Sequence, residues 1–375
     1  MKKFKVMSIF GTRPEAIKMM PVIKELDKCE EIENIVCVTA QHREMLDQVL
    51  EIFNIVPKYD LDIMKYRQTL AGLSGRILEK LDGVLNKEKP DLILVQGDTT
   101  TVFIASLVAF YNKIKVGHIE AGLRTYNKHE PFPEEMNRKL TGCITDIHFA
   151  PTINSKQNLL KENVDESTIY ITGNTSIDVL KYTIKDEYKF KEDVLNQVDY
   201  KNKKVIVMTA HRRENLGEPL KDICEATLQI ANNNSDVEII YAVHKNPAVQ
   251  EVAREVLGGH VRIHLIDPLD IEDMHNLISR CYMVMTDSGG IQEEVPSLGK
   301  PVLVLRNVTE RPEGVDAGTL KLVGTDKEVI TKTAQTLISD KAEYDKMAQA
   351  KNPFGDGTAG VQIVGIIRSL VRDEI

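Results

Sequence analysis

The stretch KVMSIFGTRPEAIK, residues 5–18, joins a short apolar run to a turn and then to a segment that opens with proline. The first six residues have the apolar and β-branched composition of a buried strand. Gly11 permits a tight turn, and Pro14 suits the first turn of a helix, where its missing N–H is not needed. The stretch therefore predicts a strand-to-helix unit, the repeating module of an α/β fold.

The same unit recurs along the chain, because short apolar runs alternate with amphipathic segments. This is the pattern of parallel strands that are covered on both faces by crossover helices. The predicted strands of the first half occupy residues 5–10, 34–40, 91–97, 115–120, 146–151 and 168–173. Those of the second half occupy residues 203–210, 237–243, 261–266, 282–287, 301–305 and 320–324. Two series of similar length predict two doubly wound, Rossmann-like α/β domains.

A chain of 375 residues is long for a single hydrophobic core, which also favours two domains. We place the first domain at residues 1–172 and the second at residues 173–355. The amphipathic C-terminal segment, residues 356–375, is expected to return to the first domain and complete it. The charged segment 181–197, which follows the boundary, is predicted to be a solvated helix.

Composition excludes several classes of protein. The formal net charge of −8 at pH 7 argues against a nucleic-acid-binding surface. No run reaches the roughly 18 apolar residues of a membrane span, so no membrane partner is expected. The N-terminal residues lack the pattern of a signal peptide. Five scattered cysteines without CxxC spacing indicate neither a disulfide framework nor a zinc site. We expect a cytoplasmic protein with no bound metal.

Four motifs directly follow predicted strands, and ligands of open α/β sheets bind beyond the carboxyl ends of the strands. The first is the turn that holds Arg13, which is placed to reach an anion at a helix N-terminus. Its alternative is a plain strand-to-helix turn with a surface arginine. The second is TDSGGIQEE, residues 286–294, whose paired glycines let backbone N–H groups approach a phosphate. The alternative for the second motif is a helix cap made by Ser288, with Glu293 reaching back.

The third and fourth motifs carry an acid and a histidine. VQGDTTT places Asp98 after a strand, and TAHRREN places His211 after another. The alternatives are a helix cap for the aspartate and a solvent-facing surface for the basic trio. With Glu120 and Glu134 these residues form a set suited to proton transfer. The sequence lacks the motifs of P-loop kinases, nicotinamide enzymes, metalloproteases and serine hydrolases.

Eight motifs together carry a resemblance to a known family. They are FGTRPEAIKM, GDTTT, GHIEAGLRT, PFPEEMNR, GNTSIDVL, TAHRREN, TDSGGIQEE and GKPVLVLRNVTERPE. In order and spacing the chain resembles the bacterial non-hydrolysing UDP-N-acetylglucosamine 2-epimerases. The resemblance implies a GT-B-like fold, in which two Rossmann-like domains face each other across a cleft. It also implies a cytoplasmic homodimer that needs no cofactor and supplies cell-envelope polysaccharide synthesis.

The activity implied by the resemblance is reversible epimerisation at carbon 2 of UDP-N-acetylglucosamine, which yields UDP-N-acetylmannosamine. No ring carbonyl acidifies the hydrogen at carbon 2, so the family eliminates UDP to form 2-acetamidoglucal and then adds UDP back. Proton removal and return on opposite faces require carboxylates. The residues that match the family's catalytic positions are Asp98, Glu120, Glu134 and His211. Glu135 is expected instead to be a helix-start residue.

The motifs also match positions at which the family binds its substrate. These positions are Arg13, Lys18, Arg138, Met274, Ser288, Gly289, Gly290 and Glu294. The serine and the glycines are expected to cradle the diphosphate, and the last glutamate to accept hydrogen bonds from the ribose. Lys18 is expected to support the catalytic acids. Met274 stands where relatives often have an aromatic residue beside the uracil, and its sulfur can pack on the ring.

Some related bacterial enzymes bind a second UDP-N-acetylglucosamine molecule as an activator. The residues that match this effector site are Gln41, Arg67, Arg212 and His244. Glu134 is expected to touch both molecules. Glu44 stands where some relatives have glutamine, and an added carboxylate near a diphosphate would weaken effector binding. The alternative is that these are ordinary polar residues at loop edges.

Other functions stay open at this point. A GT-B glycosyltransferase would need an acceptor, and a hydrolysing epimerase would release free N-acetylmannosamine and UDP. A regulatory module that only binds a nucleotide sugar would not require Asp98, Glu120 and Glu134 together. Product analysis separates these alternatives.

Overall fold

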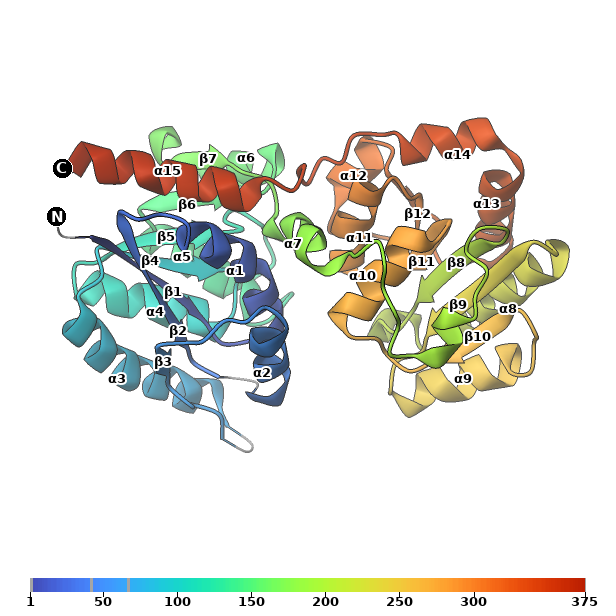
Figure 1. Cartoon of the computed structure of the whole chain (residues 1–375), viewed down its shortest axis with the longest axis horizontal. Coiled ribbons are helices and arrows are strands. Elements are labelled where there is room, and N and C mark those ends of the chain that lie inside the picture. Colours follow the sequence, from blue (N-terminus) through green and yellow to red (C-terminus); the bar gives the residue numbers. More distant parts are fainter. Residues whose placement is uncertain (1–2, 41–42, 66–67, 375) are drawn as a thin grey trace. The chain divides into compact units, whose positions relative to one another are not determined.

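The computed structural model describes residues 3–40, 43–65 and 68–374. The chain divides into two compact units (Figure 1), of which unit 1 comprises Met1–Val179 and Gly355–Ile375 and unit 2 comprises Leu180–Phe354. Each unit is built around one parallel sheet, which confirms the predicted fold class of two parallel-sheet α/β domains. Within the described ranges, no helix is both long enough and apolar enough to cross a membrane.

The sheet of unit 1 has seven strands in the order β3-β2-β1-β4-β5-β6-β7, and each neighbouring pair is parallel. The strands are β1 (Phe4–Phe10), β2 (Ile32–Val38), β3 (Tyr59–Asp60), β4 (Leu92–Gln96), β5 (Lys115–Ile119), β6 (Ile147–Ala150) and β7 (Ile169–Ile171). The sequence predicted all of them except β3. A strand of two residues is too short to show a period.

Helices cover both faces of this sheet. They are α1 (Arg13–Leu26), α2 (Arg43–Ile52), α3 (Leu70–Glu88), α4 (Thr100–Tyr111), α5 (Glu134–Ile144), α6 (Ile153–Lys161), α7 (Thr175–Thr183) and α15 (Ala359–Glu374), with a 3-10 helix at Glu166–Thr168. Apolar side chains of α3 and α4 form one core cluster with those of β1, β2 and β4. The chain passes from unit 1 to unit 2 within α7, shortly after the boundary expected at residue 173.

The C-terminal helix α15 returns to unit 1 and packs against α1 (Figure 1). The buried carboxylate of Asp178 accepts hydrogen bonds from the N–H groups of Ala359 at 3.2 Å and Gly360 at 2.8 Å. A Cβ atom at Gly360 would lie 3.2 Å from the backbone of Pro21 in α1. Close packing of the two helices therefore depends on this glycine.

The sheet of unit 2 has six parallel strands in the order β10-β9-β8-β11-β12-β13. They are β8 (Lys204–Thr209), β9 (Val237–Ala242), β10 (Ile263–Ile266), β11 (Met283–Thr286), β12 (Val302–Val304) and β13 (Leu320–Leu322), and the sequence predicted all six. The helices are α8 (Glu218–Asn233), α9 (Pro247–Leu257), α10 (Ile271–Arg280), α11 (Gly289–Glu294), α12 (Pro312–Asp316), α13 (Lys327–Ser339) and α14 (Lys341–Ala348). Short 3-10 helices lie at Asp193–Asn196, Arg213–Asn215 and Val295–Leu298.

The solvated helix predicted for residues 181–197 is wrong. Helix α7 ends at Thr183, and the following residues are not helical until the short 3-10 helix at 193–196. Phe190 is buried in a core cluster of unit 2, and its ring meets that of Tyr188 edge to face at 5.3 Å. The charged residues of this segment conceal the two-residue spacing of its aromatic side chains, which is the spacing of extended chain.

Each sheet has a switch point, a place where the strand order reverses and the loops after the two flanking strands diverge. In unit 1 it lies between β1 and β4, and in unit 2 between β8 and β11. The four motifs singled out in the sequence follow these four strands. The fold therefore brings them together in two pairs, one pair in each unit.

Candidate functional site

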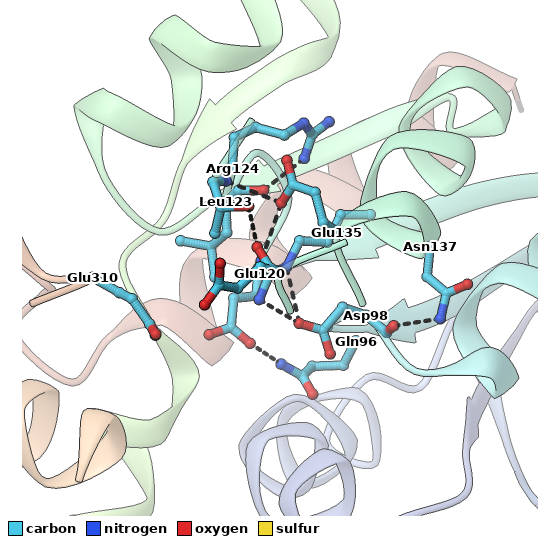
Figure 2. Close-up of polar contacts among 12 residues, drawn as sticks. Gln96, Asp98, Glu120, Leu123, Arg124, Glu135, Asn137 and Glu310 are labelled. Atoms are coloured by element: carbon cyan, nitrogen blue, oxygen red, sulfur yellow. Dashed lines mark hydrogen bonds and ion pairs between the residues drawn. The ribbon is translucent and has the colours of Figure 1, made fainter. Parts of the chain in front are cut away.

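Asp98 is held by the turn between β4 and α4. Gly97, which precedes it, has a φ of +80°, a conformation that favours glycine. Two nitrogens of Arg138 lie 2.7 and 2.9 Å from one carboxylate oxygen of Asp98. The backbone carbonyl of Asp98 accepts a hydrogen bond from Asn137 at 2.9 Å (Figure 2). The N-cap of α4 is Thr99, so the helix-cap alternative for Asp98 is wrong.

Glu120 directly follows β5 and is almost completely buried. Its φ of +64° is costly for a residue other than glycine, and such strain is concentrated at functional sites. One carboxylate oxygen lies 2.6 Å from Nζ of Lys18 and 3.2 Å from Nδ2 of Asn174. The other accepts a hydrogen bond from Gln96 (Figure 2). Lys18 balances the negative charge, and the two amides orient the carboxylate.

Gln96 and Asn174 are site residues that sequence reasoning missed. Both stand inside quoted motifs, in VQGDTTT and GNTSIDVL. Their positions next to the ends of strands β4 and β7 were the signal that would have found them.

His118, two residues before Glu120, contacts the turn that precedes Asp98. Its ring is buried, and Nε2 lies 2.7 Å from the carbonyl oxygen of Gly97. Burial lowers the pKa of His118 to about 3. The ring is therefore neutral at physiological pH, and it donates a hydrogen bond that holds the turn before Asp98.

Two adjacent glutamates begin α5. Glu134 is half-buried at the first position of the helix, and Glu135 is buried at the second. The carboxylate of Glu135 accepts hydrogen bonds from the N–H groups of Thr125 at 3.0 Å and Tyr126 at 2.9 Å. It also lies 3.4 Å from Arg138. Glu135 is thus a helix-start residue that also holds the loop after β5 and the arginine that pairs with the acid after β4.

A buried acid that sequence reasoning did not single out joins the loops after β1 and β4. Glu15 accepts hydrogen bonds from the N–H groups of Gly11 at 3.0 Å and Thr12 at 2.7 Å, and from the hydroxyl of Thr99 at 2.6 Å. Burial raises the pKa of Glu15, and these hydrogen bonds act in the opposite direction. Arg13, half-buried at the start of α1, is therefore on a fixed turn. The Thr-x-x-Glu spacing of a capping box was the signal.

In unit 2, His211 follows β8 and Asp287 follows β11. Asp287 is completely buried, and one of its oxygens accepts hydrogen bonds from three donors. The donors are the backbone N–H groups of His211 at 2.7 Å and Arg212 at 2.8 Å, and the Asn215 side chain at 3.0 Å. The ring of His244 stacks on that of His211, with centroids 5.2 Å apart and planes 10° apart. The backbones of His211 and Arg212 are anchored in this way, so the solvent-facing alternative does not describe these two residues, whereas Arg213 is exposed.

Four influences act on the pKa of His211. Burial, the largest, lowers it, and the carboxylate of Asp287 raises it. The neighbouring His244 and Arg212 also lower it. The net direction is downward, which favours a neutral ring with one nitrogen free to accept a proton.

The loop after β11 leads into α11, which opens with Gly289 and Gly290. The side chain of Ser288 makes no capping hydrogen bond, and Glu293 lies 2.8 Å from Arg311. The helix-cap alternative for this motif is therefore wrong. A Cβ atom at Gly289 would lie 3.4 Å from the guanidinium carbon of Arg311, so a cation borders the start of α11. Sequence reasoning missed Arg311, although it stands in the last of the quoted motifs.

Glu294 and Met274, the expected ribose and uracil contacts, lie on neighbouring helices of unit 2. Glu294 ends α11, and its carboxylate lies 3.3 Å from Nε2 of His275 in α10. The buried His275 is itself held by the hydroxyl of Thr183 at 2.8 Å. Met274 is half-buried and packs against the core cluster of unit 2 that contains Phe190.

The expected effector residues are described only in part. Arg212 and His244 lie in unit 2, where His244 stacks on His211. Gln41 and Arg67 lie outside the described residues, as does the side chain of Glu44.

Comparison with known proteins identifies the family. A family model described as UDP-N-acetylglucosamine 2-epimerase matches residues 24–368. A protein of Bacillus subtilis strain 168, named UDP-N-acetylglucosamine 2-epimerase, is 57% identical over 97% of this chain and 95% of its own length. The chain belongs to the UDP-N-acetylglucosamine 2-epimerase family. The resemblance drawn from the eight motifs is therefore confirmed.

Solved structures of 2-epimerases have the same fold. The UDP-GlcNAc 2-epimerase of Neisseria meningitidis, solved with UDP-GlcNAc, has a TM-score of 0.87 and 48% identity, covering 98% of this chain and all of its own. An S. aureus protein solved with UDP has a TM-score of 0.85 and 51% identity, covering 98% of this chain and 97% of its own. The two parallel-sheet domains of this chain are those of the 2-epimerase family.

Proposed function

We propose that this chain interconverts UDP-N-acetylglucosamine and UDP-N-acetylmannosamine as a non-hydrolysing 2-epimerase. The observation that carries the proposal is a pair of acids at the carboxyl ends of two adjacent strands of unit 1, β4 and β5. Asp98 and Glu120 follow adjacent strands, and each is held by a cationic side chain. The relatives solved with UDP-GlcNAc and with UDP support the choice of substrate.

The reaction is an elimination followed by an addition. A carboxylate removes the proton from carbon 2 while the bond between carbon 1 and the UDP oxygen breaks, which leaves 2-acetamidoglucal with a double bond between carbons 1 and 2. A proton then returns to the opposite face of carbon 2, and UDP adds back to carbon 1. Atoms and charges balance without an oxidant, a reductant or water, so acid–base chemistry is sufficient.

Asp98, Glu120 and Glu134 are the acids that we assign to proton removal and return. Glu120 is the most firmly positioned, since Lys18 and two amides contact its carboxylate. Arg138 is paired with Asp98, so an arginine that contacts the diphosphate would also orient this acid. Such prepositioned groups avoid reorganisation during the reaction.

Unit 2 supplies the leaving-group site in this proposal. Ser288 and the backbone of Gly289 and Gly290 hold the diphosphate at the start of α11, with Arg13 as a further contact. His211 is assigned with the acids to proton transfer. Glu294 accepts hydrogen bonds from the ribose, and Met274 packs near the uracil. Neutralisation of the diphosphate charge makes UDP a better leaving group.

We also propose that a second UDP-N-acetylglucosamine molecule activates the enzyme through Gln41, Arg67, Arg212 and His244. The proposal extends to a cytoplasmic homodimer that supplies cell-envelope polysaccharide synthesis. Both parts are drawn from the family resemblance of the motifs.

The test is to incubate the purified full chain with UDP-N-acetylglucosamine and follow the products by proton NMR. The proposal predicts UDP-N-acetylmannosamine and a constant total of UDP-sugar. Free N-acetylmannosamine with stoichiometric UDP would instead identify a hydrolysing epimerase. Turnover only with an added acceptor would identify a glycosyltransferase, and binding without turnover would identify a regulatory module.

A further inference from the structure

We propose that Asp287 is a positioning residue that keeps the neutral ring of His211 protonated on Nδ1 and leaves Nε2 as the reactive nitrogen. The catalytic consequence rests on the proposed function. The tautomer itself depends only on the geometry of unit 2.

The orientation of the Asp287 carboxylate is fixed by its donors. Three hydrogen bonds, from the backbone of His211 and Arg212 and from the side chain of Asn215, converge on Oδ2. Oδ1 is buried and has no hydrogen-bond partner among the described residues, while Nδ1 of His211 lies 3.4 Å from it. A buried acceptor without a donor is costly, and an ionised carboxylate only accepts hydrogen bonds. The imidazole is placed to satisfy Oδ1 by donating from Nδ1.

The other charged and titratable groups around the ring do not compete for this role. Nδ1 of His244, the ring stacked on His211, accepts the N–H of Asn246 at 3.1 Å. That nitrogen is therefore an acceptor and does not donate to Asp287. Arg212 directs its Nε to the backbone carbonyl of Asp287 at 3.3 Å. The carboxylate is thus the acceptor that faces Nδ1.

The same residue joins the two loops of the unit 2 switch point. Thr209 and Thr286 are register partners at the ends of β8 and β11, and their hydroxyl oxygens lie 2.6 Å apart. Asp287 is the next residue after Thr286, and its carboxylate binds the backbone N–H groups of His211 and Arg212 in the other loop. Ser288, of the expected diphosphate loop, directly follows it in the chain. Orientation of the imidazole and of the expected diphosphate loop therefore depends on a single carboxylate.

The substitution Asp287→Asn tests this role because the fixed donors dictate how the new amide sits. Its oxygen must occupy the Oδ2 position, where three N–H groups converge, so its NH₂ group faces Nδ1 of His211. Nδ1 must then accept, and the proton moves to Nε2. The size of the side chain and the link between the loops are preserved while the tautomer is reversed.

The experiment is long-range ¹H–¹⁵N NMR of the full chain labelled in histidine, with the His211 signals identified by their loss in His211→Asn. We expect Nδ1–H in the wild type and Nε2–H in Asp287→Asn. The variant should lose about 10²–10⁴-fold in kcat, as for a misoriented general base. Its UDP affinity should change by less than about three-fold. The pH at which His211 limits kcat/KM should move down, because Asp287 raises the pKa of that histidine.

Asp273→Asn is the matched control, because Asp273 is also a buried carboxylate of unit 2 but binds the hydroxyl of Tyr188. It should leave the His211 tautomer and the pH profile as in the wild type. A wild-type ring protonated on Nε2 would overturn the inference even if the Asp287 variant fails to fold. An Asp287→Asn protein that keeps Nδ1–H would overturn it as well. The NMR result stands independently of turnover, so a failed epimerase assay would refute the proposed function and leave this test valid.

Discussion

Glu120 draws its surroundings from four separate parts of the chain. Lys18 comes from α1, Gln96 from the end of β4 and Asn174 from the segment before α7, while β5 leads into the glutamate itself. The motif GHIE predicted an acid at a strand end, and the family resemblance predicted its catalytic role. The amide partners were not predicted, because residues this distant in sequence meet only once the strand order is known.

At the residue scale, Glu120→Gln should lower kcat by about 10²–10⁴-fold, since the amide keeps the size of the side chain and removes the titrating group. UDP affinity should be nearly unchanged, because the expected contacts to UDP include the serine and glycines of unit 2. Steady-state kinetics and calorimetric titration with UDP measure both quantities.

Glu88→Gln is the control for that substitution. Glu88 is also a buried glutamate of unit 1. It contacts Lys5 at the start of β1, whereas Glu120 follows the end of β5, so the two acids lie at opposite ends of the strands. Its variant should turn over at close to the wild-type rate. If Glu120→Gln keeps more than about a tenth of the wild-type kcat, well short of the loss expected for a missing acid or base, Glu120 is not catalytic.

At the element scale, Glu88 connects the end of α3 to the edge of the sheet. Its carboxylate accepts a hydrogen bond from the hydroxyl of Tyr59 and lies 2.9 Å from Lys58 and 3.3 Å from Lys5. These contacts, that of Tyr59 first, lower the pKa of Glu88 to about 2. In the unfolded chain a glutamate titrates near about 4.3. The stabilisation is therefore complete above that pH and is lost as the pH falls towards 2.

The free energy of unfolding should consequently decline more steeply with acid in the wild type than in Glu88→Gln. Chemical unfolding followed at pH 7, 4 and 3 measures the difference between the two proteins, in which the other titrating groups cancel. Parallel pH curves would show that the Glu88 contacts make no contribution to stability.

The predicted elements succeeded or failed for a physical reason. Buried parallel strands show as nearly continuous apolar runs, so all twelve predicted strands are present. The helix prediction for residues 181–197 failed because the many lysines and acids of this segment outnumber its buried aromatic residue, Phe190, and the half-buried Tyr188. The helix-cap alternatives for Ser288 and Asp98 also failed, although both residue types are common caps. The Ser288 side chain makes no capping hydrogen bond, and the Asp98 carboxylate pairs with Arg138.

At the scale of the whole molecule, the eight family motifs are distributed over both units, and activity is expected to require both. The proposed effector residues also come from both halves of the sequence. A ligand that contacts them all would favour one arrangement of the chain through its differential affinity.

We therefore expect purified UDP-N-acetylmannosamine to be turned over only after a lag, which a trace of UDP-N-acetylglucosamine should remove. His244→Ala and Arg67→Ala should blunt this activation more than they weaken UDP binding. His260→Ala is the control, since the ring of this half-buried histidine binds the side chain of Asn232 and the N–H of Arg262 instead. Progress curves recorded from the reverse direction measure the lag. A reaction that starts at once and follows a hyperbolic rate curve would contradict the effector site.

The central claim, that carbon 2 is inverted by loss and return of its proton with UDP as the leaving group, is tested most directly in deuterated water. The full chain is incubated with UDP-N-acetylglucosamine, and the hydrogen at carbon 2 is followed by proton NMR. Because the proton passes through an exchangeable carboxyl group, both epimers should acquire deuterium at carbon 2. UDP-N-acetylmannosamine that forms with its original proton still at carbon 2 would contradict the account.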